Sequence, residues 1–268
     1  MTHVMVPDGV LPWWLTAAGW ALAAALLGLA LWRLRGVPAP RMVPLVGVTT
    51  AMMAVIMSVE LVPIGYELHL TALTGMIVGP WYGVIAALLF NLLRALIGDG
   101  AWTNIGLNTT ITWLEIALGA ALWAALRPVA QRRSALAAGA TTLAGLIVTT
   151  AVFVAIMGLS TVSPTAVFEV GAFDAQAGAF RPAPLSGGVV SVHAAERQDA
   201  DAAPATDERA GFRQFAIAVM LLGAIGAAIE ATFTGAIVAF IARVRPELLG
   251  LHRAPVEAEV RRAPLAPV

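Results

Sequence analysis

The amino-acid sequence predicts an all-α polytopic membrane protein with about seven transmembrane helices, its N-terminus outside and its C-terminus in the cytoplasm. Three observations predict this class. Of the 268 residues, 59% are hydrophobic and only 12% are charged, against about 45–50% and about 25% in a typical soluble domain. Apolar stretches of membrane-spanning length recur along the chain. Arginines cluster after some of these stretches and not after others, which gives the orientation of the helices. The composition excludes an ordinary soluble globule and a disordered chain.

The residue types that are missing exclude further classes of function. There is no cysteine and no lysine, and the 16 basic residues, all arginine, balance 16 acidic ones. Disulfides, thiolate metal sites and cysteine nucleophiles are therefore excluded, as are a Schiff-base lysine and the lysine of a phosphate-binding Walker loop. A net charge of zero gives no sign of a nucleic-acid partner.

The apolar stretches define the expected helices in chain order. A bilayer core of about 30 Å is crossed by about 20 helical residues. The stretches cover residues 13–32, 43–59, 70–97, 105–126, 135–159 and 215–242. Residues 70–97 contain Gly79-Pro80-Trp81, so this stretch is either one long kinked helix or a short arm followed by a full one.

Arginine placement decides between these alternatives. The arginines that follow helices form three clusters: Arg33, Arg35 and Arg41; Arg127, Arg132 and Arg133; and Arg243, Arg245, Arg253, Arg261 and Arg262. Arginine-rich loops stay in the cytoplasm, and all three clusters share that side only if residues 70–97 cross twice. We therefore expect a seven-helix membrane domain over residues 1–250, with a long extracytoplasmic loop at about 160–213 and a disordered cytoplasmic tail over 251–268.

Two histidines on the predicted outer side, His3 and His69, are candidate metal ligands. A terminal amine, backbone amide nitrogens and the imidazole of His3 would close a planar chelate, a geometry that suits Ni(II) and Cu(II). If Met1 is removed, Thr2 supplies the amine and His69 can fill the remaining position; if Met1 is retained, its amine completes the set without His69. His69 is equally well explained as an interfacial helix cap.

Polar residues near these histidines are candidates for holding them in place. Asn108 and Asn104 precede or begin the predicted fifth helix, where an amide could orient a metal-binding histidine, although Asn104 is also a natural helix N-cap. Glu115 and Glu230 lie inside predicted spans, where a carboxylate is costly and is functional or paired by default. We expect Glu115 to lie deeper under the site. Glu230 could instead be a protonated or arginine-paired packing residue.

Two further groups of residues have simpler expectations. Arg94 lies one turn from the outer end of its helix, where it is expected to extend its guanidinium to the interface or to pair with Asp99. Met52, Met53 and Met57 could be soft metal ligands, but methionines in an apolar helix usually serve packing.

Several segments match a known family in order and spacing. They are Val6-Pro7-Asp8-Gly9-Val10-Leu11-Pro12, His69-Leu70-Thr71 with Gly79-Pro80-Trp81, Gly98-Asp99-Gly100 with Gly106-Leu107-Asn108, and Ile229-Glu230 with Arg243 through Leu249. Over about residues 6–112 and 223–249, the chain resembles the cobalt/nickel substrate-capture subunits of energy-coupling-factor transporters, the CbiM/NikM group.

This resemblance implies a membrane subunit that binds Co(II) or Ni(II) as its transported substrate, without a cofactor of its own. Its implied partners are a CbiQ/NikQ-like coupling subunit, CbiO/NikO-like ATPases and, as a further candidate, a small CbiN/NikN-like accessory subunit. It implies a multi-pass location in a bacterial or archaeal cell membrane. In the family, the metal site consists of the terminal amine, the amide and imidazole of a second-place histidine, and a histidine before the third helix, where His69 falls.

The N-terminus departs from the family pattern. The second-place histidine of the family aligns with Met5, and His3 lies two residues earlier. Three explanations are open: Thr2-His3 reaches the site in a chain that has lost Met1, the metal geometry differs, or the solute is a different one. The alternatives are thus a substrate-capture subunit for an organic solute and, from another class, an intramembrane enzyme that uses Glu115 or Glu230 as an acid or base.

Overall fold

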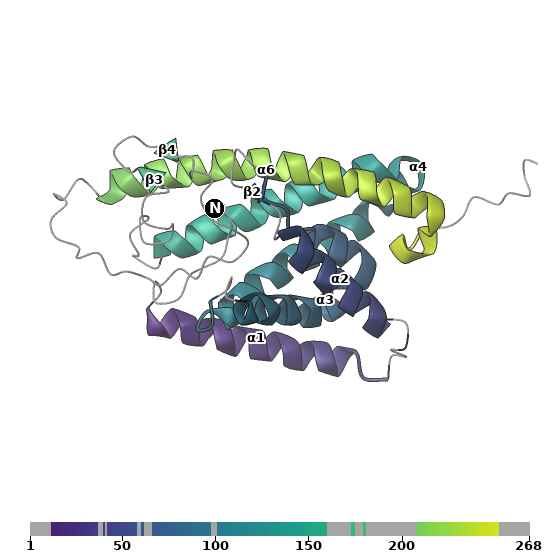
Figure 1. Cartoon of the computed structure of the whole chain (residues 1–268), viewed down its shortest axis with the longest axis horizontal. Helices are drawn as coiled ribbons and strands as arrows, with labels where there is room; N and C mark the ends of the chain where they lie inside the picture. The colour runs from purple at the N-terminus through teal and green to yellow at the C-terminus, as the bar shows by residue number, and fades with distance from the viewer. Residues whose placement is uncertain are drawn as a thin grey trace, which may run out of the picture.

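The computed structural model describes residues 12–36, 40, 42–57, 60–61, 66–97, 101–159, 173–174, 179–180 and 208–251. Helices dominate this part of the chain (Figure 1): α1 (Trp13–Arg33), α2 (Met42–Met57), α3 (Thr71–Leu96), α4 (Ile105–Leu159) and α6 (Glu208–Val244), followed by the 3-10 helix η1 (Pro246–Leu249). Two antiparallel pairs of two-residue strands join β1 (Glu60–Leu61) to β2 (Tyr66–Glu67) and β3 (Phe173–Asp174) to β4 (Ala179–Phe180).

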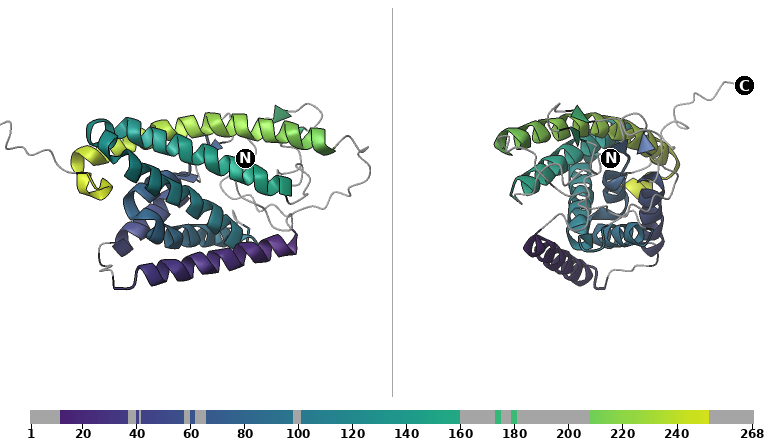
Figure 2. Two further views of the ribbon diagram at one scale, coloured as in Figure 1. Left: turned by 180° about the vertical axis from the view of Figure 1, so that it is seen from behind. Right: turned by 60° about the vertical axis from the view of Figure 1, so that its left-hand side comes forward.

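Four of the described helices are long and apolar enough to cross a membrane: Trp13–Arg33, Thr71–Leu96, Ile105–Ile156 and Ala216–Val244. The helix α2 is apolar but has only 16 residues. Figures 1 and 2 show α1 and α6 on opposite sides of the bundle, with α2, α3 and α4 between them. The predicted class, an all-α polytopic membrane protein, is therefore confirmed at the level of helices and apolar spans.

The predicted interruption of the third apolar stretch lies inside α3, at Gly79. Its φ of 73° and ψ of 177° are not helical, and a positive φ of this kind is open to glycine at little cost. Gly75 and Gly83 both pack against Ile116 of α4, although they would be about 12 Å apart along a straight helix. The helix therefore bends sharply at Gly79. The Trp113 indole of α4 donates to the carbonyl of the next residue, Pro80, at 3.0 Å.

The helix α4 covers the two predicted apolar stretches 105–126 and 135–159. Residues 127–132 and Ser134 are helical, and only Arg133, with φ −141° and ψ 63°, interrupts the run. The arms on either side of Arg133 lie side by side, since Gly145 of the second arm packs on Leu118 of the first. The two predicted stretches are therefore the two arms of α4, and helical structure continues past residue 126 up to the break at Arg133.

The last helix begins earlier than predicted. The helix α6 starts at Glu208 instead of residue 215, so residues 208–213, expected in the long outer loop, are helical. It packs on the second arm of α4 through close contacts of Gly139 with Ala231 and of Gly235 with Ala135. Apart from β3 and β4, the expected loop over 160–207 lies outside the described residues, and so does the expected tail after Leu251.

Tight packing of α3 on α4 leads to a first prediction. A Cβ on Gly75 would collide with the backbone carbonyl of Ile116 and lie 2.9 Å from the Ala120 nitrogen. Because backbone atoms cannot move aside cheaply, we expect Gly75→Ala to lower the free energy of unfolding by about 1–3 kcal/mol, measured by thermal unfolding in detergent. Gly28→Ala is the matched control, because no atom lies within 4 Å of the added carbon. Equal melting temperatures of the two variants would contradict this packing.

Candidate metal centre

His69 lies in the short segment that connects β2 to α3, and it is buried. Its exposed fraction is 6%. The next residue, Leu70, is the N-cap of α3 and has a φ of 52°, the only positive φ of a non-glycine residue in the described chain. A left-handed conformation at a leucine costs about 1–2 kcal/mol and persists only where the surroundings impose it. The backbone at His69 and Leu70 is therefore held by contacts from outside its own segment.

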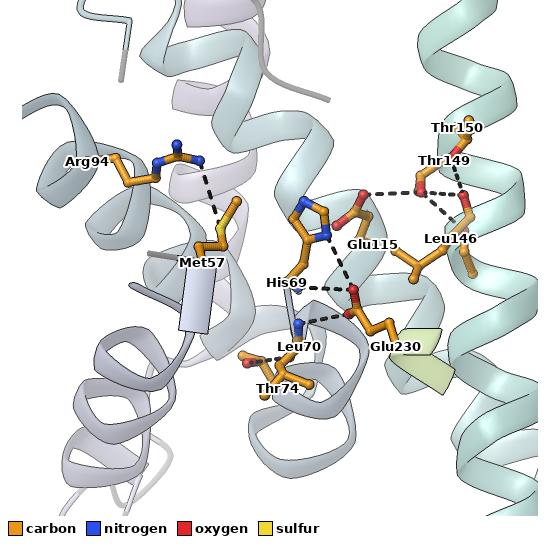
Figure 3. Close-up of polar contacts among 11 residues, drawn as sticks. Met57, His69, Leu70, Thr74, Arg94, Glu115, Leu146, Thr149, Thr150 and Glu230 are labelled. Atoms are coloured by element: carbon orange, nitrogen blue, oxygen red, sulfur yellow. Dashed lines mark hydrogen bonds and ion pairs between the residues drawn. The ribbon is translucent and has the colours of Figure 1, made fainter. Parts of the chain in front are cut away.

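Those contacts come from Glu230 of α6 (Figure 3). One carboxylate oxygen, Oε2, accepts the His69 backbone N–H at 3.0 Å, and the other, Oε1, accepts the Leu70 N–H at 2.8 Å. Oε2 also lies 3.3 Å from Nδ1 of the His69 ring. Glu230 has an exposed fraction of 0%, so these hydrogen bonds satisfy a carboxylate that is shielded from water. A single side chain thus fixes both the backbone and the imidazole of His69.

Glu230 is the residue of this centre that sequence reasoning did not include among the site residues. The available signal was its position inside an apolar span, where a carboxylate is functional or paired by default. Its partner could not be predicted from spacing, since His69 is 161 residues away. The alternative of an interfacial helix cap for His69 was wrong: α3 has Leu70 as its N-cap without a side-chain cap, and the His69 ring contacts Glu230 instead.

A second carboxylate, Glu115 of the first α4 arm, lies beside the imidazole in Figure 3. It is buried, and it is close enough to His69 and Glu230 to interact electrostatically with both. Its Oε1 accepts a hydrogen bond from the Thr149 hydroxyl of the second arm at 3.2 Å. The structure therefore brings one imidazole and two carboxylates together from three elements: the segment before α3, the first arm of α4 and α6.

Asn104 and Asn108 are buried at the start of α4. The Asn104 side-chain oxygen accepts the Thr16 hydroxyl at 2.9 Å, and the Thr103 carbonyl accepts the Trp20 indole N–H at 2.8 Å. Both contacts attach α1 to the beginning of α4. That either asparagine orients a metal-binding histidine stays a prediction.

Arg94 does not extend to the interface as expected. It is buried, its Nη1 lies 3.9 Å from the Met57 sulfur, and its guanidinium lies 6.0 Å from the centre of the Phe90 ring. The alternative partner, Asp99, lies outside the described residues. Met53 and Met57 are buried in the core that α2 shares with α3 and α4, so their predicted packing role is confirmed.

The remaining predicted ligands, Met1, Thr2 and His3, lie outside the described residues. Within the described part of the chain, no group of three histidine, cysteine or acidic side chains is arranged to hold a metal ion. His69 could therefore contribute one ligand, and a complete site would need donors from elsewhere.

The fold and the buried polar cluster define a class: a polytopic helical membrane protein whose helices enclose an oriented imidazole. The family model of the cobalt uptake substrate-specific transmembrane region, CbiM, matches residues 5–248. The chain belongs to this family, and it is thus a membrane component of metal uptake. His69, Glu115 and Glu230 lie inside the matched range, whereas His3 precedes it.

Two solved structures share the fold. One is a truncated transition metal transporter, 17% identical with a TM-score of 0.64, and the match covers 90% of this chain and 99% of that chain. The other is a transition metal transporter with the same identity and TM-score, and the match covers 90% of this chain and 93% of that one. A search of curated proteins finds no significant match.

Proposed function

We propose that this chain is the substrate-binding membrane subunit of an energy-coupling-factor transporter that imports Co(II) or Ni(II). The observation that carries the proposal is the buried imidazole of His69. Glu230 holds it in place by contacting both the backbone N–H of His69 and the Nδ1 atom of its ring. A carboxylate that accepts the second ring N–H is the usual way in which proteins orient a metal-binding histidine. Membership of a cobalt-uptake family supports the choice of ion.

The proposed chemistry uses the two ring nitrogens differently. A neutral imidazole with its proton on Nδ1 donates to Glu230 Oε2, which leaves the lone pair on Nε2 for the ion. The carboxylate makes the imidazole more basic and hence a better ligand. In a chain that has lost Met1, the Thr2 amine and the amide and imidazole of His3 would complete a planar nitrogen site with His69. A retained Met1 would instead fill the plane with nitrogens of the Met1-Thr2-His3 segment and leave His69 outside it. Glu115, with Asn104 and Asn108, would support the site from outside the ligand set.

The proposed topology has seven crossings, with the N-terminus outside and the C-terminus in the cytoplasm. The interruptions at Gly79 and Arg133 divide α3 and α4 into two arms each, which with α1, α2 and α6 make seven segments. The first α3 arm, residues 71–78, is only about 12 Å long. Its residues are buried except for the half-buried Ile77, which supports an arm that other helices shield from lipid.

The energy for transport would come from partner subunits. The sequence has no lysine, so it lacks a Walker phosphate loop. We propose a CbiQ/NikQ-like coupling subunit and CbiO/NikO-like ATPases as partners in a bacterial or archaeal cell membrane, with a CbiN/NikN-like accessory subunit as a further one. The family describes uptake rather than catalysis, which disfavours the alternative of an intramembrane enzyme.

A substrate-capture subunit for an organic solute is the second candidate, favoured by the position of His3 before the family range. Titration of purified protein with Ni(II) and Co(II), by calorimetry on the wild type and a His3→Ala variant, distinguishes the two. We expect wild-type binding that the variant weakens, with Ni(II) bound more tightly than Co(II) in the usual order for nitrogen sites. A wild-type chain without affinity for either ion would exclude the metal as substrate.

Blocking the leading amine is a second test of the same site. Acetylation or an N-terminal tag removes one of the proposed ligands, whereas a C-terminal tag leaves all of them in place. We expect N-terminal blocking to weaken Ni(II) binding by about 100-fold or more, since changes outside the ligand set alone cost about 10–100-fold. Mass spectrometry of the N-terminus identifies whether Met1 or Thr2 supplies the amine. Undiminished binding by the blocked chain would remove the N-terminus from the site.

A further inference from the structure

A cleft of about 570 Å³ lies where the two α4 arms meet and α6 ends. Its lining includes Gln131, Arg132, Arg133, Ser134, Leu136 and Arg243. Arg133 is about 27 Å of helix away from Glu115 along α4, so the cleft is separate from the candidate metal centre. Its size falls in the range of ligand pockets, about 300–1,000 Å³.

The charge of this cleft is unbalanced. Arg132, Arg133 and Arg243 are all exposed, and no acidic residue is among the lining residues. Within the described chain, none of the three forms an ion pair, in contrast to Arg245, whose Nη1 lies 3.4 Å from Glu247. Three guanidinium groups around one concavity repel each other unless an anion lies between them. The planar fork of arginine matches the oxygens of a phosphate group.

The apolar surroundings of the cleft favour a lipid over a soluble anion. Leu136, a lining residue, has an exposed fraction of 63%, and Phe240, which follows the lining residue Ala239, has one of 66%. Both lie on helices that are long and apolar enough to span a membrane. A soluble phosphate would use the arginines alone, whereas a phospholipid would use the arginines for its headgroup and these exposed apolar side chains for its acyl chains.

We propose that this cleft binds the phosphate-bearing headgroup of an anionic phospholipid. The headgroup contacts Arg132 and Arg133 at the α4 break and Arg243 in the last turn of α6, and so it links the two α4 arms to α6. Basic pockets between membrane helices are known to recognise such headgroups. The proposal does not depend on the transported solute, because the cleft and the metal centre share no residue.

The test is lipid retention by the full chain in detergent, followed by native mass spectrometry after addition of phosphatidylglycerol or of phosphatidylcholine. We expect one tightly retained phosphatidylglycerol and no retained phosphatidylcholine. The triple variant Arg132→Gln, Arg133→Gln and Arg243→Gln is expected to bind phosphatidylglycerol about 100-fold more weakly, at about fivefold for each arginine. The three single variants, expected to lose about fivefold each, decide the matter if the triple variant does not fold.

A matched control removes the same charge elsewhere. Arg33→Gln, Arg35→Gln and Arg41→Gln neutralise the first arginine cluster. Arg33 and Arg35, the two of these that the structure describes, do not line the cleft. We expect this control to retain phosphatidylglycerol like the wild type. Equal retention by the cleft variants and the wild type, or an equal loss in the control, would overturn the site. Displacement of the lipid by excess inorganic phosphate would overturn the lipid assignment in favour of a soluble anion.

Discussion

Replacing His69 with alanine is expected to abolish tight binding of Ni(II) and Co(II). In the proposed site, this substitution removes a metal ligand whose orientation is set by Glu230 at 3.3 Å from Nδ1. Loss of groups outside the ligand set costs about 10–100-fold in metal affinity, so loss of a ligand should cost more than about 100-fold. The buried position of His69, at 6% exposure, gives water little access to replace it.

Calorimetric titration and cellular accumulation of the radioactive ion measure this effect. The matched control is His252→Ala, which removes a histidine that the sequence assigns to the predicted tail and not to the site. We expect the control to bind and accumulate the ion like the wild type. A His69→Ala variant that folds normally and retains wild-type affinity would rule out His69 as a ligand and leave the solute of this chain open.

Replacing Glu230 with alanine is expected to affect both stability and metal affinity. The substitution leaves the backbone N–H groups of His69 and Leu70 without their acceptor, and each unsatisfied buried donor costs about 1–3 kcal/mol. The total loss should be about 2–6 kcal/mol in the free energy of unfolding. The His69 ring also loses its contact at Nδ1, so metal affinity should fall by about 10–100-fold.

Glu230→Gln separates these two effects. The amide of glutamine keeps one acceptor oxygen, which can still accept hydrogen bonds from the backbone N–H and the Nδ1 of His69. Its NH₂ group is a donor and stands where the carboxylate oxygen accepted the Leu70 N–H. We therefore expect a smaller loss of stability, about 1–3 kcal/mol, and a metal affinity between those of the wild type and Glu230→Ala. Thermal unfolding in detergent and calorimetry on the same samples measure the two quantities. Unchanged stability of Glu230→Ala would be incompatible with the hydrogen bonds described above.

Much of the secondary structure follows from local sequence. Apolar stretches predicted all of the long helices, and Gly79-Pro80 predicted the interruption of α3, because proline lacks an N–H and glycine tolerates a positive φ. One boundary was wrong: α6 starts at Glu208, ahead of the predicted stretch 215–242. Between the predicted stretches 105–126 and 135–159, the chain is helical except at Arg133. Polar residues at the end of a membrane helix resemble a loop in composition, although their backbone hydrogen bonding continues.

The candidate site was predicted only in part. His69 was identified by its place beside a membrane span, and Glu115 by the cost of a carboxylate inside one. Glu230 was noticed for the same reason but was not linked to His69, since the two are 161 residues apart. The snorkelling predicted for Arg94 failed because its helix turns that side chain towards Met57 and Phe90.

By itself, the sequence determined that this protein is a helical membrane protein, since hydrophobicity over about 20 residues decides whether a segment partitions into a bilayer. It also excluded a nucleotide-binding loop and thiolate chemistry, because the residues for these are missing. Only the tertiary structure decided which buried polar groups meet: Glu230 with His69 and Leu70, and Glu115 with Thr149. Such pairs depend on how distant helices pack, and helix packing depends on close contacts such as Gly75 on Ile116, which leave no periodic signal in the chain.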